Sequence, residues 1–163
     1  MQGYWNNPQA TAEALRGGWL HTGDIGMLDE HGYLFLLDRA KDMIISGGNN
    51  IYPREVEEVI VQHPAVATVV VFGVPHPYWG EAVHALVVLE AGARATAEEI
   101  IEYCAKSMAG YKKPKSVEFV DALPVSGYGK VMRREIREKY WQGYARRIGG
   151  GAPKSASSNK ERQ

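Results

Sequence analysis

The chain has 163 residues, which is enough for one ordinary domain with a buried core. Its 19 basic residues balance its 19 acidic ones, so no net field favours nucleic acid or an anionic membrane as a partner. The single cysteine excludes an internal disulfide framework and a cysteine-based zinc site, and it indicates a reducing compartment. No apolar run approaches the length of a membrane helix, and the first residues lack the basic start and apolar stretch of a leader. We therefore expect a cytoplasmic protein without a transmembrane segment.

The first part of the chain predicts a helix followed by a hairpin. Residues 9–16 have helical propensity but little apolar surface. Beyond them, short apolar strands alternate with turn signals, and the Asp-Glu-His-Gly sequence at 29–32 is the expected hairpin turn. No predicted helix covers the apolar side chains of residues 1–37, and such a hairpin is barely stable alone. This segment resembles the edge of a larger body, and its exposed apolar groups favour homo-oligomers or aggregation.

The next stretch predicts a strand, a glycine loop and a helix. Residues 43–45 form a short apolar run typical of a buried strand, and residues 46–50 (Ser-Gly-Gly-Asn-Asn) are expected to form a loop. Pro53 suits the first position of a helix, and the glutamates after it are favoured by the helix dipole. The His63-Pro64 pair is expected to end that helix.

The remaining strands give the fold class. The β-branched run at 66–74 predicts a central strand, residues 81–90 a second strand with alternating apolar positions, and residues 115–121 a third. Because helices are interleaved with these strands, we predict an α+β fold. It has a small three-stranded sheet flanked by helices, preceded by the hairpin-rich segment.

Two more helices are predicted in the second half. Thr96 and Glu99 form a capping box ahead of a helix whose apolar stripe includes Cys104. A glycine-bearing loop then leads to a basic helix at 133–141, and the residues from Gly149 onward have almost nothing to bury, which predicts disorder.

Generic catalytic patterns are absent from the sequence. The five histidines show no metal-ligand spacing, and Cys104 lies on an apolar helical stripe, which indicates the core. The sequence Gly-Tyr-Gly-Lys ending at Lys130 is not a phosphate loop, since no Ser or Thr follows the lysine. We predict no metal site. A turn containing Asp24, the stretch 37–60 and Lys130 remain, and each alone also fits a capping carboxylate, a solvated turn or a surface lysine.

Four ordered motifs between residues 3 and 140 favour a functional role for these features over the ordinary structural ones. They are GYWNNPQATAEALRGGWLHTGDIG, DRAKDMIISGGNNIYPREVEEVI, VPHPYWGEAV and YKKPKSVEFVDALPVSGYGKVMRREI. In order and spacing they resemble the C-terminal part of acyl-CoA synthetases. These belong to the adenylate-forming enzymes, which also include luciferases and peptide-synthetase adenylation domains.

The resemblance implies a reaction and a domain organisation. Such enzymes activate a carboxylic acid, for example a long-chain fatty acid, with Mg²⁺ and ATP to an acyl-adenylate, and then transfer the acyl group to CoA. A large N-terminal domain holds most of the ATP and acid sites and the Mg²⁺, while a small C-terminal domain swings between two poses. Residues 1–38 would then be the trailing segment of the large domain, residues 39–141 the mobile domain and residues 142–163 a disordered tail.

Four residues are implied to serve nucleotide binding, adenylation and domain movement. Asp24 matches the aspartate that accepts hydrogen bonds from the ribose hydroxyls, a task suited to a group with two acceptor oxygens. Arg39 matches an arginine that grips the nucleotide nearby, where a forked donor is preferred. Lys41 matches the hinge, and Lys130 the lysine whose charge bridges the acid and the α-phosphate during adenylation.

Four other residues are implied to face CoA. Gly47 and Gly48 would line the tunnel for the pantetheine arm, since glycine lets a backbone approach a thin ligand closely. Trp79 would stack near the CoA nucleotide, and Lys113 would lie near its phosphates. A simple turn and a packing tryptophan explain the same residues equally well.

Two other readings of the whole chain stay open. One is a fragment of a peptide-synthetase adenylation domain, and the other is a non-catalytic module that binds CoA or a partner such as the N-terminal domain. Because the large domain's phosphate loop and acid pocket are not in this sequence, we expect no activity from the chain alone. The setting of Lys130 also resembles lysines modified by protein acetyltransferases, and acetylation would remove its charge.

Overall fold

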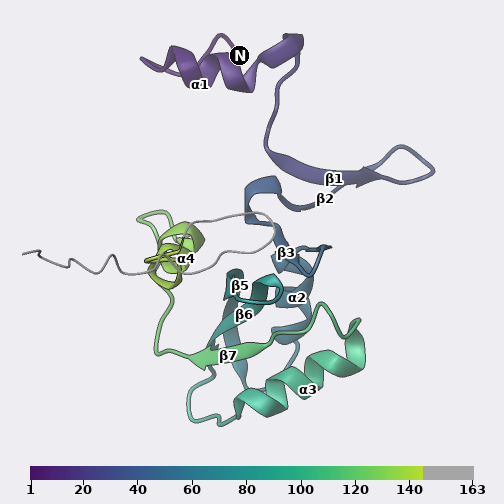
Figure 1. The fold of residues 1–163 in the computed structure, drawn as a ribbon, viewed down its shortest axis with the longest axis vertical. Coiled ribbons are helices and arrows are strands. Elements are labelled where there is room, and N and C mark those ends of the chain that lie inside the picture. Colours follow the sequence, from purple (N-terminus) through teal and green to yellow (C-terminus); the bar gives the residue numbers. More distant parts are fainter. Residues whose placement is uncertain (145–163) are drawn as a thin grey trace, which may run out of the picture. The chain divides into compact units, whose positions relative to one another are not determined.

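The computed structural model describes residues 1–144 (Figure 1). They divide into two compact units, Met1–Asp42 and the part from Met43 onward. The predicted disorder from Gly149 lies outside the described residues, whereas residues 142–144 continue as a turn in which the Tyr144 amide donates to Trp141. None of the helices described is long and apolar enough to cross a membrane.

The first unit consists of a short helix and a hairpin. Its elements are α1 (Pro8–Ala14), a 3₁₀ turn (Arg16–Gly18), β1 (Asp24–Leu28), β2 (Leu34–Arg39) and a second 3₁₀ turn (Ala40–Asp42). The strands pair antiparallel, and the Gly32 amide donates to the Asp29 carbonyl over 3.0 Å, which confirms the predicted hairpin turn. Of the hydrophobic side chains in this unit, only Ala14 is buried.

The second unit contains a five-stranded sheet. Its strands are β3 (Ile44–Ser46), β4 (Asn49–Ile51), β5 (Val66–His76), β6 (Gly80–Leu89) and β7 (Ser116–Phe119). They follow the order β4-β3-β6-β5, and β7 also pairs with β6, in parallel. The α+β class is confirmed, but the sheet has five strands rather than three. Gly47 and Gly48, with φ of 55° and 84°, turn the predicted loop into a two-residue hairpin between β3 and β4.

Strand β6, not β5, occupies the centre of this sheet. Within residues 1–144, strand β5 pairs with β6 alone, whereas β6 also pairs with β3 at Gly80 and with β7 from His84 to Val87. The prediction of a central strand at 66–74 was therefore wrong. The run is apolar because helices cover both faces of β5, and not because β5 has a strand on each side.

Helices cover both faces of the sheet, and they define two clusters of buried side chains. The helices are α2 (Pro53–Ile60), α3 (Ala97–Ser107) and α4 (Arg133–Tyr140). Buried side chains of α2 and α3 pack with Val71 and its neighbours, while Ile136 of α4 packs with Val70 and Phe72. Because Val70 and Val71 point to opposite faces, the sheet lies between α2 and α3 on one side and α4 on the other.

Local signals in the sequence account for the helix ends. Pro53 occupies the first turn of α2, as predicted. The capping box of α3 is confirmed, with Glu99 N–H donating to Thr96 Oγ1 over 3.2 Å and Thr96 N–H donating to Glu99 Oε2 over 2.7 Å. Cys104 of α3 is fully buried, and this burial raises the pKa of its thiol to about 11, so it is a core residue.

Candidate functional site

Asp24 and Arg39 form an ion pair at one end of the β1–β2 hairpin. They are partners in the strand register, and Arg39 Nε lies 3.0 Å from Asp24 Oδ1. Arg39 Nη1 also donates to the Thr22 carbonyl over 2.9 Å, while Asp24 N–H donates to Thr22 Oγ1. The two predicted nucleotide residues thus lie side by side, with about half of the arginine side chain still open to solvent.

Lys41 lies in the 3₁₀ turn Ala40–Asp42, directly before the point where the chain passes from the first unit to the second. The turn is short, and none of its residues is buried. A change of φ and ψ here would therefore disturb little buried packing, which is the requirement for a hinge.

Gly47 and Trp79 are in contact. The Gly47 amide donates to the Trp79 carbonyl over 3.0 Å, and a Cβ atom at Gly47 would lie 3.4 Å from Trp79 Cδ1. The indole stacks on the imidazole of His76, with ring centroids 4.2 Å apart. His76 Nδ1 accepts hydrogen bonds from the Tyr78 and Trp79 amides, so the histidine holds the turn that presents the tryptophan.

The ammonium of Lys115 lies over this tryptophan. Lys115 Nζ lies 4.9 Å from the centroid of the Trp79 ring, within the range of a cation–π contact. Sequence reasoning missed both Lys115 and His76. Lys115 directly precedes β7, and its amide donates to Val83 of β6, so its position follows from the parallel pairing of two distant strands. Lys113, which is half-buried, shows no contact with Trp79 in the part of the chain described.

Lys130 lies in a closed loop ahead of α4. Val125 and Val131 form an antiparallel bridge, the Ser126 amide donates to the Lys130 carbonyl over 2.8 Å, and Gly129 turns the chain with a φ of 75°. The Lys130 side chain is exposed, and within residues 1–144 its ammonium forms no ion pair. In this part of the chain, no contact joins it to the Gly47–Trp79 pair.

A polar network around the buried His84 anchors α4 to the sheet on the face that carries Phe72. His84 of β6 is 6% exposed and shares a hydrogen bond of 2.7 Å with Ser116 Oγ, and Tyr140 of α4 donates to Glu118 of β7 over 2.8 Å. Burial lowers the pKa of His84, and Glu118 opposes part of that effect. Burial and the contact with Glu118 raise the pKa of Tyr140 to about 12. These groups form a structural anchor that none of the predicted site residues joins.

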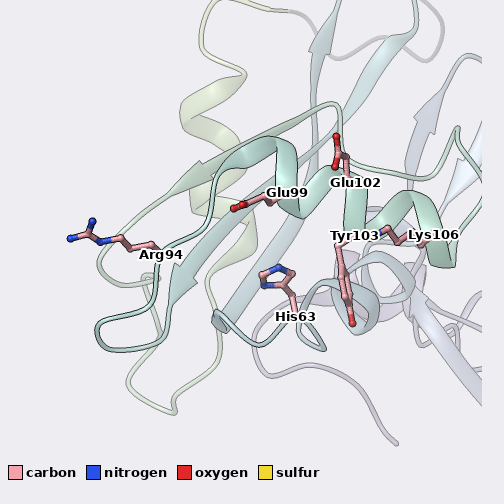
Figure 2. Close-up of a pocket in the computed structure, with 6 residues that line it drawn as sticks. All are labelled: His63, Arg94, Glu99, Glu102, Tyr103 and Lys106. Carbon is pink, nitrogen blue, oxygen red and sulfur yellow. The ribbon is translucent and has the colours of Figure 1, made fainter.

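A cavity of about 300 Å³ lies beside α3 (Figure 2). It is lined by His63, Arg94, Glu99, Glu102, Tyr103 and Lys106. Glu99 is engaged in the capping box, and the rings of His63 and Tyr103 meet edge to face, 5.1 Å apart. The cavity contains none of the predicted site residues. Residues 1–144 also contain no group of three His, Cys, Asp or Glu side chains that could hold a metal ion.

Comparison with known proteins gives one consistent family. Residues 55–130 match the AMP-binding enzyme C-terminal domain. The chain is 50% identical to a feruloyl-CoA synthase of Amycolatopsis sp. over 140 residues, which are 86% of this chain and 28% of that protein. It is 51% identical to the long-chain-fatty-acid–CoA ligase of Bacillus subtilis over 139 residues, or 85% of this chain and 25% of the ligase.

A solved structure gives the same result. It is the o-succinylbenzoate CoA synthetase of Bacillus subtilis in complex with its acyl-adenylate intermediate. That structure matches with a TM-score of 0.79 at 42% identity, over 84% of this chain and 28% of that one. The chain thus spans about a quarter of the length of the relatives it matches.

Proposed function

This chain belongs to the adenylate-forming enzymes, whose AMP-binding C-terminal domain it contains, and we propose that it is the mobile C-terminal part of an ATP-dependent acyl-CoA synthetase. In the proposed reaction a carboxylate oxygen attacks the α-phosphorus of ATP and expels pyrophosphate. The CoA thiolate then attacks the carbonyl carbon of the acyl-adenylate and expels AMP. The CoA ligases among its relatives and the acyl-adenylate bound in a structural neighbour support this assignment.

The exposed ammonium of Lys130 carries the proposal. Negative charge is concentrated where the carboxylate meets the α-phosphate, and a cation there reduces the repulsion and stabilises the transition state. Lys130 suits this role because its loop is closed by backbone hydrogen bonds while its side chain is exposed and makes no ion pair in residues 1–144. We assign it as the catalytic residue of adenylation.

The first unit would hold the nucleotide and the hinge. Asp24 would accept hydrogen bonds from the ribose, and Arg39, which already fixes the Asp24 carboxylate, would grip the nucleotide beside it. Lys41 would be the point about which the second unit turns relative to a preceding adenylation domain. The Mg²⁺ that accompanies ATP would be held by that domain and the phosphates.

The Gly47–Trp79 pair would serve the thioester step. The Gly47–Gly48 turn presents backbone without side chains next to an aromatic face, an arrangement suited to a pantetheine arm and an adenine ring. Lys113, half-buried, would meet CoA phosphates, and we add Lys115 because its ammonium lies over Trp79. The acid would be a fatty or other carboxylic acid, and the location cytoplasmic.

The exposure of the Lys130 loop also bears on regulation. Tyr128 is 95% exposed, and Lys130 lies two positions further on the same exposed loop. A protein acetyltransferase could therefore reach the ammonium, and acetylation would remove the charge that adenylation needs.

The test uses a chimera in which this chain replaces the C-terminal quarter of the Bacillus subtilis ligase. Lys130→Ala should slow acyl-adenylate formation by on the order of a hundredfold or more. Thioester formation from supplied acyl-adenylate should stay close to that of the parent chimera. Lys139→Ala, which removes an exposed lysine of α4, is the control and should change neither step. Equal losses in both steps, or none, would refute the proposed role, and CoA-ligase activity of this chain alone would refute the need for a preceding domain.

A further inference from the structure

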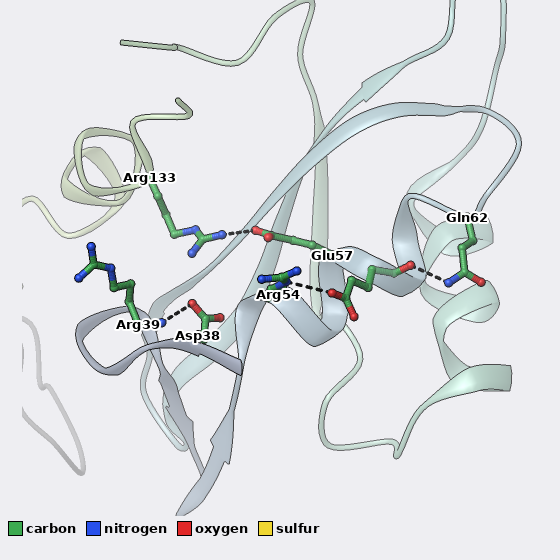
Figure 3. A network of polar contacts seen from close by, with 7 residues as sticks. Asp38, Arg39, Arg54, Glu57, Gln62 and Arg133 are labelled. Carbon is green, nitrogen blue, oxygen red and sulfur yellow. Dashed lines mark hydrogen bonds and ion pairs between the residues drawn. The ribbon is translucent and has the colours of Figure 1, made fainter. Parts of the chain in front are cut away.

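Helix α4, which follows the Lys130 loop directly, is held at both ends by polar contacts. At its first residue, Arg133 Nη2 donates to Glu57 Oε1 over 2.6 Å (Figure 3). At its C-cap, Trp141 Nε1 donates to the Gly73 carbonyl of β5 over 2.8 Å. Ile136 between them is buried against the sheet. The helix therefore has little freedom to slide or tilt.

The Glu57 carboxylate joins three elements of the second unit. Its Oε1 accepts from Arg133 of α4 and also from the Val71 amide of β5, over 2.7 Å, while Glu57 itself belongs to α2. In the part of the chain that the structure describes, β5 pairs only with β6, and Glu57 satisfies a backbone group on the other edge of β5. The arginine and glutamate side chains are 22% and 19% exposed, which limits screening of this charge-assisted bond by water.

Arg133 directly follows the residues that close the Lys130 loop. The loop closes through the bridge between Val125 and Val131 and through the Met132 amide, which donates to the Pro124 carbonyl over 2.9 Å. Arg133 is the next residue after Met132, and Lys130 stands three positions before Arg133. A movement of Arg133 would thus move the closed base of the loop and the lysine with it.

We propose that Arg133 and Glu57 are positioning residues for Lys130. Their ion pair fixes the start of α4 against α2 and β5, and through it the direction from which Lys130 enters the adenylation site. Neither residue touches the substrate. This inference rests on the proposed function, because it takes Lys130 as the group that acts on the acid and the α-phosphate.

The experiment compares Arg133→Gln and Glu57→Gln with the parent chimera in both half-reactions. Displacement of a reacting group by about 1 Å can cost on the order of a hundredfold. We therefore expect the kcat of adenylation to fall by about tenfold to a hundredfold, with little change in KM for ATP and in thioester formation. Glu57→Gln keeps an acceptor for the Val71 amide, so it tests the ion pair with the strand contact intact. Arg133→Lys, which keeps the charge without the fork, should recover part of the rate.

Arg134→Gln is the matched control. This neighbouring arginine is exposed and pairs with Glu138 on its own helix over 2.8 Å, so its removal should leave both half-reactions unchanged. Far-ultraviolet circular dichroism and thermal unfolding of each variant establish that it is folded before its kinetics are compared.

A double-mutant cycle separates the inference from the proposed function. If Arg133 acts through Lys130, Arg133→Gln should add almost no further loss in the Lys130→Ala background. Normal adenylation by Arg133→Gln, losses that multiply with those of Lys130→Ala, or equal loss in both half-reactions would overturn the positioning role while Lys130 keeps its own. Normal adenylation by Lys130→Ala alone would instead overturn the proposed function and this inference with it.

Discussion

Each unit of the chain contains a helix with a side-chain N-cap and an antiparallel pair of strands, but the units differ in what these elements cover. In the second unit, helices lie on both faces of the sheet, and the core residues of β5 and β6 are almost inaccessible to solvent. In the first unit, the hairpin β1–β2 has large apolar residues that remain more than half exposed, Phe35 and Leu36 among them.

The difference shows that local sequence signals can specify a helix or a hairpin without giving the unit a stable core. Asn7 caps α1 much as Thr96 caps α3, and Asp29 closes the first hairpin with regular backbone bonds. These contacts form the elements of the first unit without giving it a core, because a hairpin without a covered face buries too little apolar surface. The second unit has that surface, so we expect the cooperative unfolding of the chain to report on it alone.

The largest expected difference compares two phenylalanines, one from each unit. Phe72 is 1% exposed and its ring contacts His84 and Tyr140, whereas Phe35 is 52% exposed. Phe72→Ala should lower the free energy of unfolding by about 3–5 kcal/mol. Phe35→Ala should change it by less than about 0.5 kcal/mol. Urea unfolding of the chain, followed by circular dichroism, measures both.

A cost for Phe35→Ala equal to that for Phe72→Ala would show that the first unit contributes to the same cooperative core. The same two substitutions can be compared in the chimera with the Bacillus subtilis ligase. If the preceding domain covers the hairpin, Phe35→Ala should become more costly there, while the cost of Phe72→Ala should stay the same.

The sequence predicted most elements of the second unit but not how they meet. Pro53, Thr96 and Glu99 specify helix ends through local hydrogen bonds and dihedral angles, so they could be recognised without any tertiary information. Two adjacent glycines fit a loop and a tight hairpin turn equally well, so the sequence of Gly47–Gly48 predicts only a loop, and the pairing of β3 with β4 makes it a hairpin.

The candidate site follows the same division. The motifs predicted roles for single residues, which stay predictions, and the structure places Asp24 beside Arg39 and Gly47 beside Trp79. Lys115 could not be found in this way, because its place over Trp79 depends on the parallel pairing of β6 with β7. The contact of Glu57 with Arg133 joins residues 76 positions apart, and no local pattern encodes it.

The junction between the units gives the next prediction. Lys41→Pro fixes φ and removes an amide at the proposed hinge. In the chimera it should slow thioester formation by about tenfold to a hundredfold. The second unit would no longer turn to bring the Gly47–Trp79 pair to the acyl-adenylate. Lys41→Ala keeps the backbone freedom and is the control. Stopped-flow measurement of each half-reaction gives the result, and normal rates in both steps for Lys41→Pro would remove the hinge assignment.

A smaller effect is expected at the two helix caps. Thr96→Ala removes the acceptor for the Glu99 amide and should lower the free energy of unfolding by about 1 kcal/mol. Asn7→Ala removes the matching acceptor for the Ala10 amide in α1, but it should leave the main unfolding transition unchanged, because α1 lies outside the core of the second unit. Equal shifts of the transition for both variants would contradict the separation of the units.

The smallest expected effect concerns pH and the buried His84. Its pKa lies below the ordinary 6.5 because burial disfavours the charged ring, and the nearby Glu118 carboxylate offsets part of that cost. The unfolded chain therefore takes up this proton near pH 6.5 while the folded chain does not. The stabilising contribution is complete above that pH and is lost as the pH falls toward the folded pKa.

His84→Gln, which can still bond to Ser116, should remove this part of the acid destabilisation, so its unfolding free energy should decrease less than that of the parent below about pH 6.5. His31→Gln, at the exposed turn of the first unit, should follow the parent curve. Urea unfolding at a series of pH values measures the three curves. Parallel curves for the parent and His84→Gln would mean that Glu118 fully compensates the burial, whereas a changed slope for His31→Gln would show that the first unit takes part in the transition.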